Sequence, residues 1–362
     1  MSQIFEIWRL DATFAGLSAF FTCLILVLTK DWHGKFSLDS SSGVQKMHTL
    51  PTPRIGGVAI ALGVIVGYAA SSNEPAAADK RAILASIILA GIPAFVFGLL
   101  EDLTKTVSVR ARLLATMASG LLGWGITGVS ITHISLPGAD WLLGFTVFSV
   151  LFTAFAVSGV ANSINIIDGF NGLSAGAVLI MLAAFGVVAR AVGDIPLAFS
   201  CLVIAGAVLG FFLINWPLGK IFLGDGGAYF VGFALAWIAV LLPHRNISIT
   251  PWTSLLICAY PVMEVLTSYV RRALRNNHHP SQPDRLHMHH LIHARVVRKA
   301  FSKFNRIHHN ALTSPFSWLL VAMPAIAAVF TYQNKTRVLF FLLLFILIYM
   351  AIYRRLAKFK WI

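Results

Sequence analysis

The sequence predicts an all-α protein, a polytopic integral membrane helix bundle. Hydrophobic residues make up 57% of the 362 residues, and charged residues only 12%. The apolar residues form continuous segments of the length that a helix needs to cross a bilayer. The three cysteines lie far apart within such segments, which favours neither a disulfide nor a cysteine metal site. We expect one integral membrane domain over residues 1–362, with a cytoplasmic loop rich in histidine and arginine at residues 271–314.

Hydropathy along the chain predicts about eleven transmembrane helices. Their expected ranges are 13–28, 55–70, 82–100, 113–130, 141–160, 173–189, 196–214, 222–242, 252–269, 315–330 and 338–353. Glycine and proline occur inside these ranges, for example Gly91, Pro93 and Pro261. Membrane bundles tolerate both residues, so no hinge is expected from them.

The basic residues predict the orientation of the bundle. Most of the 28 lysine and arginine residues fall in one set of loops and in the C-terminal tail. The positive-inside rule places that set, and the C-terminus, in the cytoplasm. An odd number of spans then places the N-terminus in the periplasm. Topology, membrane lipids and an anionic substrate account for the net charge of +14, and no nucleic-acid partner is needed.

A polar run between two apolar segments, residues 161–173, is the first sign of a site. Asn162, Asn165 and Asp168 recur every third position, so in a helix they share one face and converge on one point. Gly169 and Gly172 leave room for a ligand to approach the backbone. A simple helix cap needs only one such side chain, so the ladder favours a functional site over a cap.

Two further groups of acids lie at expected helix ends on the same membrane face. Glu101 and Asp102 precede Lys105, and Asp225 follows Phe222 within a run of glycines. Each group alone is also typical of an interfacial anchor. Clustered carboxylates repel one another by about 4 kcal/mol per pair at about 4 Å and an effective dielectric constant near 20, which implies a bound cation. Oxygen ligands favour Mg²⁺ or Mn²⁺, and the pattern therefore predicts phosphoryl transfer.

The long polar loop holds a fourth motif. Eight of the twelve histidines fall between residues 278 and 309. Arg285 followed by His287, His289 and His290 supplies several hydrogen-bond donors for phosphate oxygens. Zinc is the alternative ligand for these imidazoles, but no cysteine or acid at a finger-like spacing completes a zinc site.

Together these motifs resemble the polyprenyl-phosphate N-acetylhexosamine-1-phosphate transferases of the WecA/MraY type, glycosyltransferase family 4. The resemblance covers residues 46–291, with four motifs in family order. The matching residues are Asp102 and Lys105; Asn165, Asp168, Gly169, Gly172 and Leu173; Phe222, Gly224 and Asp225; and His287, His289 and His290. Arg285 fits the hexosamine-transferring branch better than the peptidoglycan branch.

The chain departs from the family pattern at three places. Glu101 stands where the family usually has an aspartate, and the extra methylene moves the carboxylate by roughly 1.5 Å. Asn171 replaces an acid and keeps an acceptor without the charge. Gly227 and Ala228 replace a serine that follows Gly226 in the family. Asp102, Asp168 and Asp225 are all retained.

The resemblance implies an enzyme that moves a sugar-1-phosphate from a UDP-N-acetylhexosamine to undecaprenyl phosphate and releases UMP. The product would start a cell-surface glycan. The expected partners are these two substrates and membrane lipids, with a homodimer as one option for assembly. The expected location is the bacterial inner membrane, with the active site facing the cytoplasm.

The resemblance also implies roles for single residues. The expected catalytic residues are Asp102, Asp168, Glu101, Lys105, His289 and His290. The expected substrate-binding residues are Lys46, His48, Arg54, Asn165, Gly169, Asn171, Leu173, Phe222, Arg285 and His287. The expected ligands of Mg²⁺, or of Mn²⁺, are Asp225 and Asp102. For Lys46, His48 and Arg54 the alternative is an ordinary topology charge.

Three other functions fit parts of the pattern. A phospho-MurNAc-pentapeptide transferase of peptidoglycan synthesis belongs to the same family. A secondary transporter of an anion would place charges near the bilayer midplane, where Glu264 is the only acid inside an expected span and away from its ends. An inactive relative acting as a scaffold is disfavoured by the three retained acids. A phosphate monoester is largely a dianion at neutral pH, so direct attack on the diphosphate is favoured over a covalent intermediate on Asp102 or Asp168.

Overall fold

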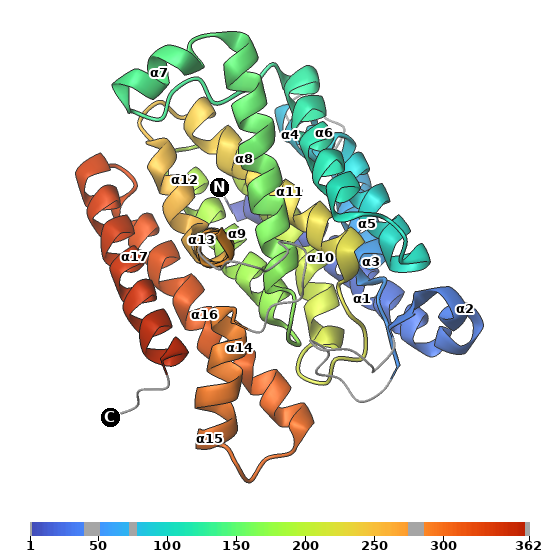
Figure 1. The fold of residues 1–362 in the computed structure, drawn as a ribbon. Coiled ribbons are helices and arrows are strands. Elements are labelled where there is room, and N and C mark those ends of the chain that lie inside the picture. Colours follow the sequence, from blue (N-terminus) through green and yellow to red (C-terminus); the bar gives the residue numbers. More distant parts are fainter. Residues whose placement is uncertain (1, 40–50, 72–77, 274–285, 359–362) are drawn as a thin grey trace.

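The computed structural model describes residues 2–39, 51–71, 78–273 and 286–358 as a bundle of helices (Figure 1). The N-terminal half contains α1 (Ser2–Leu28), α2 (Lys30–Ser37), α3 (Gly56–Ala70), α4 (Ala78–Ala90), α5 (Ile92–Thr104), α6 (Val109–Thr127), α7 (Pro137–Leu143) and α8 (Thr146–Ile167). Then follow α9 (Leu173–Ala191), α10 (Ile195–Asn215), α11 (Gly224–Arg245), α12 (Pro251–Ile257), α13 (Ala259–Ala273), α14 (Met288–Ile292), the π-helix η2 (His293–Val297), α15 (Arg298–Ala300), α16 (Arg306–Thr331) and α17 (Lys335–Ala357). Two short antiparallel strands, β1 (Leu38–Asp39) and β2 (Thr52–Pro53), pair Leu38 with Pro53.

The prediction of an all-α polytopic membrane protein is confirmed. Within the described residues, seven helices are long and apolar enough to cross a membrane, or nine if each of two bent pairs forms one span. The other two of the eleven expected spans correspond to α3, which has 15 residues, and to α6, whose first turn carries Arg110 and Arg112. The number of spans and the side of each terminus stay predictions.

Two spans are bent, and the expectation of no hinge was wrong for them. The axes of α4 and α5 differ by 41°, and those of α12 and α13 by 79°. Pro93 lies in the first turn of α5 and Pro261 in the first turn of α13. Proline has no N–H to donate to the preceding turn, so each helix starts afresh there at a new angle.

The outer helices present apolar side chains to the surroundings. Phe21 on α1, Phe155 on α8 and Phe340 on α17 are all more than half exposed. In a bilayer such side chains contact lipid, which is as apolar as they are.

Helix α11 is the centre of the bundle. Of its most apolar 18-residue stretch, 94% is buried, and it packs against α3, α5, α6, α8, α9 and α12. Its first turn contains Asp225 and begins at Gly224, whose φ of 74° favours glycine. The central helix therefore holds its only acid at one fixed end.

Glycines on neighbouring helices let the backbone approach this first turn. A Cβ on Gly57 of α3 would lie 2.2 Å from the backbone nitrogen of Gly227. A Cβ on Gly98 of α5 would lie 2.6 Å from the carbonyl oxygen of Asp225. Because no side chain separates them, α3 and α5 pack directly on the start of α11 and bring their own polar residues beside Asp225.

Candidate active site

Asp225 is the meeting point of residues from four parts of the chain. Its side chain is 5% exposed, and its Oδ1 accepts hydrogen bonds from Arg54 Nη2 at 2.5 Å and from Asn165 Nδ2 at 3.1 Å. Its Oδ2 accepts one from Nη1 of Arg112. Arg54 precedes α3, Arg112 lies on α6 and Asn165 on α8, so the structure brings Asn165 of the polar run beside Asp225 of the glycine-rich motif.

Asp102 lies beside Asp225 but has different partners. Its Oδ1 and Oδ2 accept hydrogen bonds from the backbone N–H groups of Asp225 and Gly226, each at 2.8 Å. Nε of Arg54 lies 3.2 Å from Oδ1. A carboxylate that binds the first N–H groups of a helix satisfies donors that have no partner within that helix. Asp102 therefore fixes the start of α11, and its predicted role as a metal ligand stays a prediction.

The arrangement joins two carboxylates to two guanidinium groups. The acids are almost fully buried, whereas the side chains of Arg54 and Arg112 are 28% and 14% exposed. Arginine binds carboxylate and phosphate oxygens with the same planar set of donors. An arriving phosphate can therefore take over the guanidinium groups, and that exchange uncovers the oxygens of Asp225.

The donor set fits Mg²⁺ in one particular way. The described residues contain no group of three or more histidine, cysteine or acidic side chains that would enclose a metal. Mg²⁺ is usually held by one or two carboxylates together with substrate phosphates, so a complete protein cage is not required. Asp225 fits that role because its oxygens are held only by side chains, which can move away.

Asp168 ends α8 and faces a different neighbour. Its Oδ1 accepts a hydrogen bond from the hydroxyl group of Ser174 at the start of α9. Burial raises the pKa of Asp168 to about 6, while the Ser174 hydroxyl and the Arg54 guanidinium act in the opposite direction. Asp168 therefore has a different partner from the two asparagines of the polar run. The side-chain oxygens of Asn162 and Asn165 both lie 3.4 Å from the hydroxyl group of Tyr229.

The pKa of Asp168 predicts a pH dependence. If the carboxylate form is needed, turnover should fall as the pH drops through about 6. In Ser174→Ala the hydrogen bond that favours the carboxylate is lost, so the pKa rises and the acid limb moves to higher pH. Rates measured between about pH 5 and pH 8 test this, because titration of a lipid phosphate is the same for both proteins. An unmoved acid limb in Ser174→Ala would contradict the role of Asp168.

The turn after Asp168 is built into the core. Asn171 is 7% exposed; its Nδ2 donates to the carbonyl oxygen of Pro217, and its backbone groups bind Asn310 and Ser314 of α16. Leu173 is fully buried. These contacts hold the turn in place, and the predicted substrate contacts of Asn171, Leu173 and Gly169 stay predictions.

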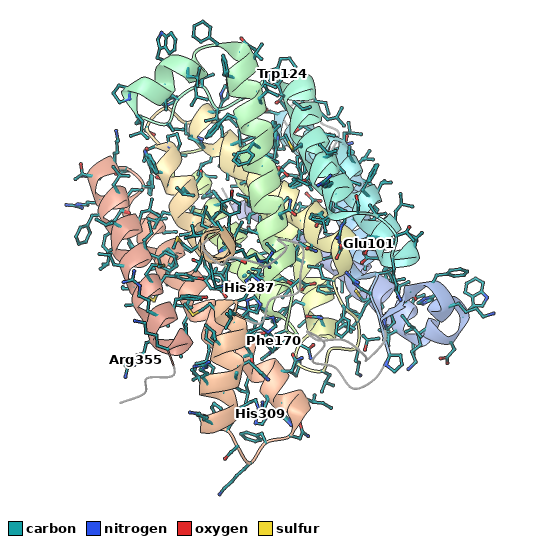
Figure 2. All side chains as sticks on the ribbon, viewed as in Figure 1. Glu101, Trp124, Phe170, His287, His309 and Arg355 are labelled. Atoms are coloured by element: carbon teal, nitrogen blue, oxygen red, sulfur yellow. The ribbon has the colours of Figure 1, made fainter. Side chains whose placement is uncertain are left out.

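The histidine motif lies against this turn. His287, His289 and His290 are each less than 9% exposed, and the ring of Phe170 lies 5.9 Å from that of His289 and 5.4 Å from that of His290. Figure 2 shows Phe170 and His287 in the same half of the bundle as Glu101 and Arg355, with Trp124 at the opposite end. The structure thus brings the polar run at residues 161–173 and the histidine motif together.

The remaining predicted residues lie around this centre or outside the described residues. Glu101 accepts a hydrogen bond from the backbone N–H of Val107 at 2.8 Å, and Nζ of Lys105 donates to the carbonyl oxygen of Leu38 at 3.1 Å. The backbone of Phe222 pairs with Pro53 and Gly56, which ties β2 to the start of α11. Lys46, His48 and Arg285 lie outside the described residues.

Sequence reasoning missed three residues of this region. Arg112 was indistinguishable from other basic residues of the predicted cytoplasmic loops. Phe170 stood unremarked inside the polar run. Glu264 was noted only in connection with transport, although an acid inside an apolar span is itself a signal of function.

Comparison with known proteins agrees with this geometry. The model of glycosyl transferase family 4 matches residues 84–243. An undecaprenyl-phosphate alpha-N-acetylglucosaminyl 1-phosphate transferase of Escherichia coli O157:H7 is 30% identical over 278 residues, which cover 75% of this chain and 73% of the relative. The protein of the same name from Yersinia pestis is 29% identical, over 71% of this chain and 70% of the relative. A probable undecaprenyl-phosphate N-acetylglucosaminyl 1-phosphate transferase of Bacillus subtilis is 28% identical, over 68% and 67%.

The fold and the cluster of acids and arginines define a multi-pass membrane protein with a site suited to phosphate groups. The chain belongs to glycosyl transferase family 4. It is therefore a phosphotransferase of a kind that is generally metal-dependent. The predicted family is confirmed.

Proposed function

We propose that the protein transfers N-acetylhexosamine-1-phosphate from a UDP-sugar to undecaprenyl phosphate, releases UMP and so starts a cell-surface glycan. The relatives from E. coli, Y. pestis and B. subtilis are named as N-acetylglucosaminyl 1-phosphate transferases acting on undecaprenyl phosphate, which supports both substrates. The observation that carries the proposal is the cluster of Arg54, Arg112 and Asp225 at the first turn of the central helix. It provides one carboxylate for a cation and two guanidinium groups for phosphate oxygens in a single place.

The residues of the chain divide the work of binding the phosphates. Asp225 would hold Mg²⁺ or Mn²⁺, and the cation would supply positive charge to the diphosphate. Arg54 and Arg112 bind phosphate oxygens in place of Asp225. Asp102 keeps the start of α11 fixed, so that the carboxylate of Asp225 stays in one position. Asp168 orients the acceptor phosphate from the turn after α8.

The transfer itself needs charge stabilisation more than a strong base. The acceptor is a phosphate monoester whose second pKa lies near 6, and much of it is a dianion at neutral pH. Direct attack on the diphosphate is therefore sufficient. Lys105 neutralises negative charge as UMP leaves, and so do His289 and His290 when they carry a proton. Phe222, two residues before α11, would stack on the uracil ring.

The location follows from the same proposal. The isoprenoid chain of the acceptor stays in the bilayer, because moving so many CH₂ groups into water costs about 0.8 kcal/mol each. The distribution of basic residues supports a site at the cytoplasmic face of the bacterial inner membrane. Membrane lipids, and in one form of assembly a second copy of the chain, are its other partners.

Release of UMP from purified protein tests the function. We expect UMP only when undecaprenyl phosphate, a divalent cation and a UDP-N-acetylhexosamine are all present. EDTA should abolish the release, and Mg²⁺ or Mn²⁺ should restore it, because the acids cannot neutralise a diphosphate unaided. UDP-MurNAc-pentapeptide serves as the comparison substrate, and its preferential use would assign the chain to the peptidoglycan branch. Sustained turnover in metal-free buffer would contradict the proposed site.

A further inference from the structure

Glu264 is a buried acid that belongs to neither the arginine cluster nor the predicted metal site. It lies on α13, beyond the bend with α12, and is 1% exposed. Its Oε2 lies 3.1 Å from Nδ1 of His287, and its Oε1 lies 3.1 Å from the hydroxyl oxygen of Tyr260. Burying a carboxylate costs several kcal/mol unless its partners compensate. Its partners are residues of the histidine motif, so its role is to be sought there.

The carboxylate faces the same ring atom of two histidines. Nδ1 of His289 lies 3.6 Å from Oε1, an ion-pair distance, and the backbone N–H of Met288 donates to Oε2 at 3.3 Å. When Nδ1 of an imidazole faces a carboxylate, that nitrogen carries the proton, and Nε2 on the other edge of the ring is left with its lone pair. Glu264 therefore determines which nitrogen is offered to the opposite side.

On that opposite side, Nε2 of His289 points at the turn after Asp168. It lies 3.3 Å from the position that a Cβ on Gly169 would occupy. Both ring nitrogens of His289 are buried. Nδ1 has the ion-pair contact with Glu264 at 3.6 Å but no hydrogen bond, and Nε2 has no hydrogen-bond partner in the part of the chain that the structure describes. Leaving a buried polar atom unpaired is unfavourable, which favours a ligand that pairs with it. Gly169 leaves open the space through which that ligand would approach.

We propose that Glu264 is a positioning residue that keeps His289 protonated on Nδ1 and presents Nε2 to the acceptor phosphate at the Asp168–Gly169 turn. The proposal rests on the proposed function, because it takes its phosphate from that reaction. A phosphate monoester that still carries its second proton passes that proton to Nε2. The products are the attacking dianion and an imidazolium held between phosphate and Glu264. No other group gains or loses a proton in this step.

Several other titratable groups lie near Glu264 and His289 in the described part of the chain. Burial lowers the pKa of His289 from its usual value, so the resting ring is neutral. Glu264 opposes that shift and so favours the protonated ring that the proposed step forms. The other titratable groups near Glu264 and His289 are Tyr260 on α13, Tyr349 on α17, Asp168 beside Gly169, and His287, His290 and His293. Among these, Glu264 is the one that contacts the Nδ1 edge of both His287 and His289.

Glu264→Gln tests the proposal with a change of nearly the same size. The amide of glutamine can donate to Nδ1, which would move the ring proton of His289 to Nε2. We expect a fall in kcat of about 10- to 100-fold, as for other residues that orient a functional imidazole, with little change in KM for the UDP-sugar. Tyr260→Phe is the matched control, because it removes one contact of Glu264 and keeps both histidine contacts. Its turnover should stay near that of the unmodified protein.

The tautomer gives a readout that does not depend on activity. In protein with ¹⁵N-labelled histidine, the signal that disappears in His289→Gln should be that of a ring protonated on Nδ1. The same signal should change to the Nε2-protonated form in Glu264→Gln and persist in Tyr260→Phe. An Nε2-protonated His289 in the unmodified protein would overturn the proposal, even if Glu264→Gln failed to fold. Absence of UMP release from the unmodified protein would instead refute the proposed function, while the tautomer still tests the placement of His289.

Discussion

Replacing Asp225 by asparagine should lower turnover by several orders of magnitude while the protein stays folded. The carboxylate is the one acid of the cluster whose two oxygens are held only by the side chains of Arg54, Arg112 and Asn165. Asparagine is nearly the same size, but its amide is a poor ligand for a divalent cation, and its charge no longer balances that of the arginines. Interactions that act mainly in the transition state affect kcat far more than stability.

Two measurements separate this loss from a general loss of structure. Mg²⁺ together with a UDP-sugar should raise the melting temperature of the unmodified protein, because a ligand that binds only the folded state stabilises it. That increase should be absent in Asp225→Asn. The matched control is Asp194→Asn. Asp194 is a buried aspartate just before α10, and its carboxylate pairs at 2.9 Å with Nε of Arg245 at the other end of α11. This control should keep turnover, and near-normal turnover in Asp225→Asn would mean that the metal site has been misplaced.

The fold was largely predictable because a hydropathy profile detects apolar segments that are long enough to cross a membrane as helices. The central part of each of the eleven expected ranges falls on a helix or on a bent pair of helices. The bends at Pro93 and Pro261 were not predicted, since averaging over a window contains no information on the direction of a helix. Proline is also tolerated inside one continuous helix, as Pro315 and Pro324 in α16 show. Only the packing of the bundle decides between the two outcomes.

The site was predictable where the sequence combined a charge with an unusual neighbour. Asp225 stood out by its glycines, and Asn165 by its place in a polar ladder; the structure joins them at 3.1 Å across 60 residues of sequence. Arg112 could not be singled out, because its role comes from the packing of α6 and α5 against α11. The same holds for Glu264, whose partner His287 lies 23 residues further along the sequence.

The roles of Asp102 and Asp225 are harder to tell apart by sequence, because both are acids of family motifs. The structure separates them by their partners, since Asp102 binds backbone N–H groups and Asp225 binds side chains. This difference predicts that the same substitution has different consequences at the two positions.

Asp102→Asn should lower both stability and turnover. One of its two oxygens becomes an NH₂ group, which then faces the N–H of Asp225 or of Gly226, and two donors cannot pair. An unsatisfied buried donor costs about 1–3 kcal/mol, and Arg54 also loses the charge that holds its Nε at 3.2 Å. We expect a lower melting temperature than for Asp225→Asn, and a fall in kcat because the carboxylate of Asp225 is no longer fixed. If Asp102→Asn instead kept its melting temperature and lost only the stabilisation by Mg²⁺, then Asp102 would be a metal ligand. Its backbone contacts would in that case be secondary to metal binding.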